Sequence, residues 1–64
     1  MPVFIVDMWE GRTIKQKGQL AKGITDEFIK IGMPRDQVHI IFKDNMKSNW
    51  ATGDKLASEE QQHQ

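Results

Sequence analysis

Residues 3–9 have the sequence Val-Phe-Ile-Val-Asp-Met-Trp, and this stretch decides the fold of the chain. It is rich in β-branched and aromatic residues, which favour a β-strand. Side chains alternate between the two faces of a strand, and in this stretch both faces are mostly apolar. A strand with two apolar faces is typical of a parallel sheet that is covered on both sides.

A helix is predicted next, over residues 14–31, where apolar residues recur at helical spacing. Thr13 stands three residues before Gln16, which is the spacing of a capping box at a helix start. On the polar side of this helix, Asp26 and Lys30 have the acid-first i,i+4 order that favours an ion pair. The pattern therefore indicates one amphipathic helix directly after the first strand.

Gly32 ends this helix, and residues 37–43 (Gln-Val-His-Ile-Ile-Phe-Lys) predict a second strand. Strand, helix and strand in this order form a βαβ unit with parallel strands. We therefore expect an α+β fold, with one domain over residues 1–64. The polar stretch after Asp44 predicts a short loop or hairpin, and residues from about 58–64 predict a flexible tail.

The length of the chain predicts self-association. A chain of about 60 residues buries only about 60% of the surface that it exposes when unfolded. The chain contains no cysteine, so disulfides and thiolate metal sites are excluded, and its two histidines are poorly placed to share a metal. One helix covers only one face of a two-stranded sheet, so we expect a second subunit to cover the other face.

The charge balance argues against two classes of partner. Nine basic and nine acidic residues cancel, which removes the electrostatic argument for binding nucleic acid. The apolar stretch at the start is too short to span a bilayer, and no basic region precedes it. The expectation is a cytoplasmic protein without a membrane partner.

The chain also carries a proline directly after Met1, Glu-Gly-Arg at residues 10–12, Trp-Ala-Thr-Gly at residues 50–53 and Leu-Ala-Ser at residues 56–58. With the βαβ pattern and the length, these features resemble the 4-oxalocrotonate tautomerase family over nearly the whole chain. The resemblance implies a four-stranded dimer and a hexamer made of three dimers. It also implies a cofactor-independent isomerase, with no metal, that tautomerises 2-hydroxydienoate or enol-pyruvate-type acids such as 2-hydroxymuconate.

The resemblance assigns roles by position. Pro2 would be the general base once Met1 is removed, because its nitrogen then becomes an amine with a usable lone pair. Arg12 would hold the carboxylate of a small-molecule substrate, and Trp50 stands where the family has an aromatic wall residue, usually phenylalanine. His39 stands where the family has a second arginine, and histidine lacks the permanent positive charge of arginine.

Each of these residues also has a purely structural interpretation. Pro2 suits the first position of a strand, and Arg12 could pair with Glu10 at the surface. Trp50 could anchor a subunit interface, where tryptophan is enriched, and His39 could lie half-buried there. The second hypothesis is therefore an oligomeric binding or scaffold protein that keeps the tautomerase fold without the activity.

Overall fold

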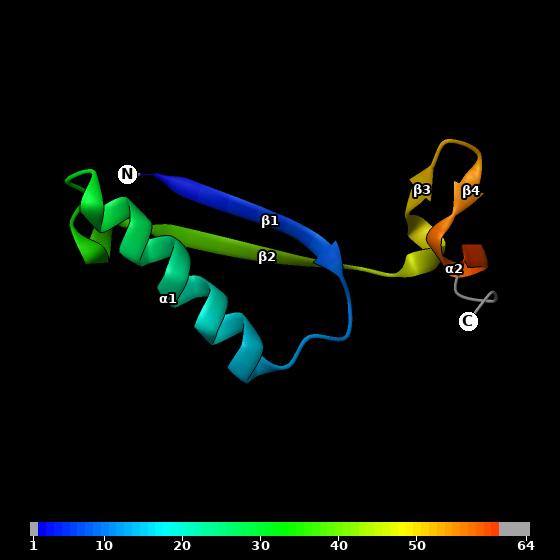
Figure 1. Cartoon of the computed structure of the whole chain (residues 1–64), viewed down its shortest axis with the longest axis horizontal. Helices are drawn as coiled ribbons and strands as arrows, with labels where there is room; N and C mark the ends of the chain where they lie inside the picture. Colours follow the sequence, from blue (N-terminus) through cyan, green and yellow to red (C-terminus); the bar gives the residue numbers. More distant parts are fainter. Residues whose placement is uncertain (1, 61–64) are drawn as a thin grey trace.

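The computed structural model describes residues 2–60, which form a βαβ unit followed by a small C-terminal arm (Figure 1). The elements are β1 (Val3–Trp9), α1 (Ile14–Lys30), η1 (Arg35–Gln37), β2 (His39–Asn45), η2 (Lys47–Asn49), β3 (Ala51–Thr52), β4 (Lys55–Leu56) and α2 (Ala57–Glu60). The long strands β1 and β2 pair in parallel, and β3 and β4 form an antiparallel hairpin. The predicted α+β fold, with one helix between two parallel strands, is confirmed.

The second strand begins and ends two residues later than the sequence pattern predicts. Gln37 lies instead in the 3₁₀ turn η1, where its N–H donates to the Pro34 carbonyl at 3.0 Å. At the other end, the N–H of Glu10 donates to the Asn45 carbonyl at 3.0 Å, which prolongs the pairing with β1. The register pairs Val3 with His39 at one end and Trp9 with Asn45 at the other.

The predicted capping box at the start of α1 is confirmed. The side chain of Thr13 accepts from the backbone N–H of Gln16 at 3.1 Å, and the Gln16 side chain accepts from the Thr13 N–H at 3.0 Å. These two bonds satisfy backbone donors that the first turn of a helix leaves without a partner. They also fix the direction in which the chain enters the helix from the loop after β1.

The helix ends at Lys30, one residue before the predicted end, through a pair of backbone hydrogen bonds. The N–H of Gly32 donates to the Ile29 carbonyl at 3.0 Å, and the N–H of Met33 donates to the Phe28 carbonyl at 3.1 Å. This is the bonding pattern of a Schellman motif, which requires a residue with positive φ. Gly32 supplies it with a φ of 98°, so the predicted stop at this glycine is confirmed.

The ion pairs on α1 differ from the predicted one. Asp26 binds Lys22 at 2.8 Å and Arg35 at 3.1 Å, whereas Lys30 binds Glu27 at 3.0 Å. The predicted pair between Asp26 and Lys30 is wrong because the turn η1 returns to the helix and brings Arg35 to Asp26. Hydrogen bonds from Lys22 and Arg35 to the Asp26 carboxylate lower the pKa of this carboxyl group.

Helix α1 covers one face of the two-stranded sheet. The ring of Phe4 packs edge-on against Phe28 of the helix, with 6.1 Å between ring centroids. Farther along, the Lys17 ammonium binds the Asp44 carboxylate at the end of β2. Aromatic packing near the start of β1 and an ion pair near its end therefore connect the helix to the sheet.

The opposite face of the sheet is apolar and uncovered. Ile5 and Ile41 lie opposite each other in the register and are 52% and 46% exposed. Val3 shares this face, and it is also exposed. Among the side chains that the structure describes, only Ala57 is buried. The isolated chain therefore has almost no hydrophobic core of its own.

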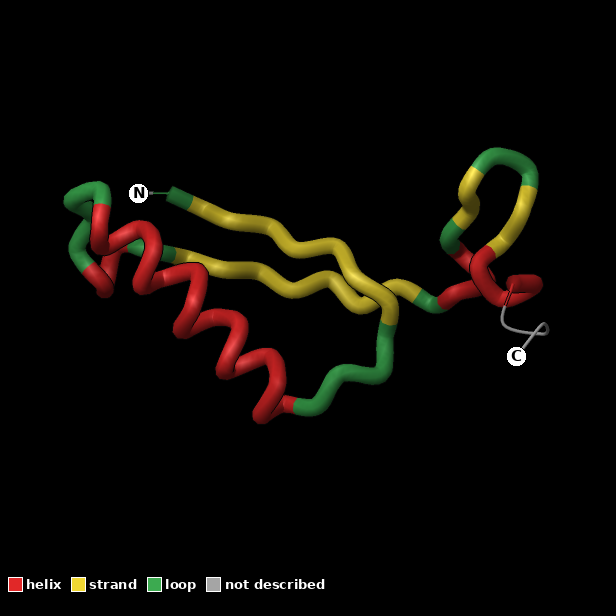
Figure 2. Tube along the Cα trace, in the orientation of Figure 1, coloured by secondary structure: helices red, strands yellow, loops and turns green. Residues whose placement is uncertain are grey.

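The shape of the chain agrees with this burial pattern. The radius of gyration is 15.1 Å, whereas a compact chain of this length would have a value of about 11 Å. Figure 2 shows the reason, because the arm formed by η2, β3, β4 and α2 extends beyond the end of the long strands. Residues 58–60 of the expected tail belong to α2, and residues 61–64 lie outside the described part of the chain.

Two glycines allow a matched test of the backbone. A β-carbon at Gly23 in α1 or at Gly53 between β3 and β4 would meet nothing within 4 Å, but Gly53 has a φ of +64°. Gly23→Ala should raise the free energy of unfolding by about 0.5–1 kcal/mol, because alanine favours a helix. Gly53→Ala should lower it by about 1–2 kcal/mol, because alanine is strained at positive φ. Urea unfolding at one fixed protein concentration measures both changes, and a destabilising Gly23→Ala would contradict this structure.

Candidate active site

Pro2 lies at the start of the sheet, beside the first residue of β2. The carbonyl of Pro2 accepts a hydrogen bond from the backbone N–H of His39 at 3.1 Å, and Met1 lies outside the described residues. Pro2 is half-buried, and the exposed His39 shares the uncovered sheet face with its register partner Val3. The structure thus brings two of the four predicted site residues together.

A cavity of about 460 Å³ lies at this same end of β1. It is lined by Phe4, Ile24, Glu27, Phe28 and Ile31. Four of these side chains are apolar, but Phe4 and Ile31 are 41% and 73% exposed in the single chain. The cavity is therefore an open apolar hollow near the start of β1, and Pro2 is not among the residues that line it.

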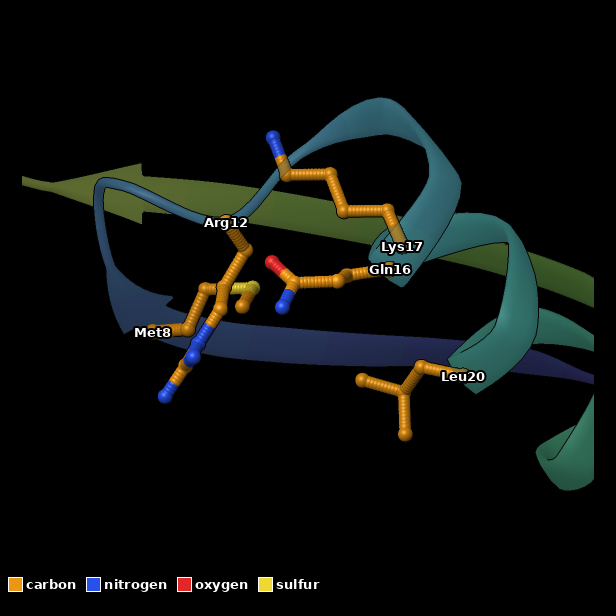
Figure 3. A pocket seen from close by; sticks show the side chains of 5 residues that line it. All are labelled: Met8, Arg12, Gln16, Lys17 and Leu20. Carbon is orange, nitrogen blue, oxygen red and sulfur yellow. The ribbon is translucent and has the colours of Figure 1, made fainter.

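Arg12 lies at the opposite end of β1, in the loop that leads to α1. It lines a cavity of about 220 Å³ together with Met8, Gln16, Lys17 and Leu20. In Figure 3 the side chains of Arg12, Met8 and Gln16 converge, whereas Lys17 points away from them. A second polar group, the Gln16 amide, thus lies in the cavity wall with the guanidinium.

The guanidinium of Arg12 has no acidic partner within residues 2–60. The ion pairs of this part of the chain involve the other arginine, Arg35, and three lysines. The alternative in which Arg12 pairs with Glu10 is therefore not observed. A guanidinium is always charged and can bind a carboxylate through two parallel hydrogen bonds, so Arg12 is available for an anionic ligand.

Trp50 lies near the carboxyl end of β1, in contact with Trp9. The two ring centroids are 5.8 Å apart, with an angle of 78° between the ring planes. The ammonium of Lys47 lies 4.7 Å from the centroid of the Trp9 ring. The sequence contains only two tryptophans, one at the end of the first strand and one after the second, and their contact follows from the parallel register.

The four predicted site residues therefore form two separate groups in one chain. Pro2 and His39 lie where β1 and β2 begin, and Arg12 and Trp50 lie beyond the point where β1 ends. Strand β1 has seven residues, which corresponds to about 23 Å. A single copy of the chain cannot place Pro2 and Arg12 on the same small substrate.

Residues 2–60 contain neither a cluster of metal ligands nor a helix that could span a membrane. No three histidine or acidic side chains lie close enough together to hold a metal ion. No helix in this part of the chain has both the length and the apolar character needed to cross a membrane.

Comparisons with known proteins agree in sequence and in fold. A family model described as "Tautomerase enzyme" matches residues 2–60. A probable tautomerase from Lactiplantibacillus plantarum is 32% identical over 62 residues, which cover 95% of this chain and 97% of that protein. A probable tautomerase from Ralstonia nicotianae is 38% identical over 61 residues, which cover 94% of each chain.

Two solved structures have the same fold. One of the 4-oxalocrotonate tautomerase isozymes from Methylibium petroleiphilum superposes with a TM-score of 0.92 over 98% of this chain and 100% of that chain, at 23% identity. A 4-oxalocrotonate tautomerase homologue, TTHB242, superposes with a TM-score of 0.82 over 91% of this chain and 94% of that chain, at 30% identity. The first superposition includes the arm, because it covers almost the whole chain.

Proposed function

This chain belongs to the tautomerase family, and on that premise we propose that it is a cofactor-independent enol–keto tautomerase of 2-hydroxydienoate or enol-pyruvate-type acids. Pro2 is the general base in this proposal, and Arg12 holds the substrate carboxylate. The observation that carries the proposal is the Arg12 guanidinium, which lines a cavity and has no acidic partner within residues 2–60.

The proposed reaction moves one proton from oxygen to carbon. The uncharged Pro2 nitrogen takes the proton of the enol hydroxyl, the carbonyl double bond forms, and the electron pairs shift along the conjugated carbons. The protonated Pro2 then returns this proton to carbon, so the base is regenerated and no other reactant is needed. A cation beside the developing enolate oxygen or the carboxylate stabilises this charge, and Arg12 has that role.

The separation of Pro2 from Arg12 supports a site that two chains share. The free edge of β1 is mostly apolar, whereas β2 carries Lys43 and Asp44, and charged residues on a strand edge discourage pairing. We therefore propose that the β1 strands of two copies pair in antiparallel orientation and form a four-stranded sheet. This pairing brings Pro2 of one copy towards Arg12 and Trp50 of the other.

The uncovered sheet face supports a larger assembly. Antiparallel pairing leaves the helices of both copies on one side of the four-stranded sheet and the exposed face with Ile5 and Ile41 on the other. Burial of apolar surface contributes about 25 cal/mol per Å². Three dimers that turn these faces inward would bury them, so we propose a hexamer composed of three dimers.

Arg12 can be tested against the other arginine of the chain. Arg12→Ala should lower kcat/KM about 10- to 100-fold, because a charge-assisted hydrogen bond contributes about 1.5–3 kcal/mol. Ketonisation of 2-hydroxymuconate and of phenylenolpyruvate is followed by absorbance, on protein whose intact mass shows that it begins at Pro2. Arg35→Ala is the control, because Arg35 binds Asp26 on the outer side of α1.

Three results would contradict this assignment. Equal kcat/KM values for Arg12→Ala and the wild-type protein would contradict the proposal that Arg12 holds the substrate carboxylate. Full activity of protein that retains Met1 would contradict the proposal that Pro2 is the base. The absence of turnover with both substrates, in correctly processed wild-type protein, would favour the non-catalytic binding or scaffold protein instead.

The assembly can be tested on the uncovered face. Ile5→Lys should raise the concentration needed for half-assembly at least about tenfold, because a charge then replaces an apolar side chain in the buried interface. Ile14→Lys is the matched control, since Ile14 is 91% exposed at the start of α1. Sedimentation velocity over a dilution series measures both variants, and equal behaviour of the two would contradict burial of the Ile5 face.

His39 provides a test of substrate charge. Because it replaces a permanent cation, the wild-type protein should handle monocarboxylate enols comparatively well. His39→Arg should raise the ratio of kcat/KM for the dicarboxylate 2-hydroxymuconate over phenylenolpyruvate by about tenfold, through one charge-assisted contact. His39→Gln should leave this ratio close to its wild-type value. A strong dicarboxylate preference of the wild-type protein would contradict the prediction.

A further inference from the structure

Trp9, Trp50 and Lys47 form a compact cluster at the carboxyl end of β1, here called the aromatic cluster. The two indole rings meet edge to face at 5.8 Å, and the Lys47 ammonium lies 4.7 Å from the Trp9 ring centroid. Trp9 is nevertheless 41% exposed, and Trp50 is only half-buried. The single chain therefore leaves part of the indole surface uncovered.

The backbone around the aromatic cluster is held on both sides. The Asn45 side-chain amide donates to the Met8 carbonyl at 3.2 Å and to the Lys43 carbonyl at 3.1 Å, which ties the ends of the two long strands together. On the other side, the N–H of Ala57 donates to the Trp50 carbonyl at 2.7 Å, and Ala57 is buried. A surface that is ordered before binding loses less entropy when a ligand arrives.

The charge of Lys47 is not neutralised by the described part of the chain. Lys47 takes part in none of the ion pairs within residues 2–60, and its ammonium lies over the Trp9 ring. The aromatic cluster is therefore an apolar ring surface with a cation at its border. An aromatic ring that carries a carboxylate or enolate fits both parts of such a surface, through ring–ring contact and charge attraction.

We propose that the aromatic cluster is a subsite for the ring of an aryl-substituted acid, with Lys47 as a cation for its anionic group. Trp9 and Lys47 thereby become specificity-determining residues beside the predicted wall residue Trp50. The identification of this acid as an enol substrate rests on the proposed tautomerase function. The binding of the ring does not, because it can be measured without turnover.

The test uses three unreactive ligands and the full chain in its native assembly. The ligands are 3-phenylpropanoate, 3-cyclohexylpropanoate and 3-phenylpropanamide. The cyclohexyl acid lacks the aromatic ring, and the amide lacks the negative charge. Both tryptophans lie in the aromatic cluster and the chain has no tyrosine, so tryptophan fluorescence reports this cluster alone. Isothermal titration calorimetry gives Kd independently of the fluorescence change.

The wild-type protein should bind 3-phenylpropanoate about three- to tenfold more tightly than the cyclohexyl acid, which is the range expected for one aromatic pair. Burial alone would favour the larger cyclohexyl group, so this order is specific to ring contact. Trp50→Leu should abolish the preference, and Trp50→Phe should restore most of it. Lys47→Met should reduce the preference for the acid over the amide, whereas Lys55→Met on the same arm should not.

The subsite is rejected if the cyclohexyl acid binds as tightly as the phenyl acid to the wild-type protein, or if Trp50→Leu keeps the preference while circular dichroism and assembly are unchanged. The role of Lys47 is rejected if Lys47→Met and Lys55→Met behave alike. If the phenyl acid binds more tightly but no enol substrate is turned over, the subsite is supported and the tautomerase function is contradicted. If enol substrates are turned over but the phenyl acid is not preferred, only the subsite is contradicted.

Discussion

A two-stranded sheet has two faces, and this chain has one long helix with which to cover them. Helix α1 covers one face through the contact between Phe4 and Phe28, and the other face presents Ile5 and Ile41 to solvent. The arm cannot cover it, because the arm extends beyond the ends of the strands (Figure 2). Two strands alone are marginally stable in water. The missing second layer is therefore the constraint on which the stability of the chain and its proposed assembly depend.

The same constraint governs the proposed chemistry. The long strands hold Pro2 at one end and Arg12 at the other, and the parallel register keeps these ends apart. A base and a carboxylate anchor at this separation cannot act on one small acid within a single chain. Antiparallel pairing of two β1 strands would remove the separation and cover the apolar edge of β1 in one step. In this proposal, catalysis and assembly depend on the same apolar strand.

The C-terminal arm contributes Trp50 to an aromatic surface that it shares with Trp9 of β1. In this arm Ala57 is buried and its N–H donates to the carbonyl of Trp50, whose ring packs against Trp9. Residues far apart in the sequence thus form one aromatic surface, with Lys47 beside it. In the proposed mechanism this surface selects among substrates, whereas the proton transfer itself depends on Pro2 and Arg12.

Local signals in the sequence were enough to predict the two strands, the capping box at Thr13 and Gln16, and the helix stop at Gly32, because each depends on neighbours within a few residues. The family resemblance supplied the proposed roles of Pro2, Arg12, His39 and Trp50, which periodicity alone does not contain. Only the tertiary structure decided the start of β2, the partners of Asp26 and the contact between Trp9 and Trp50. Each of these depends on segments that meet only after the chain folds back: η1 brings Arg35 to Asp26, and the parallel register places the arm beside the end of β1. The register also separates Pro2 from Arg12, a distance that no local pattern in the sequence contains.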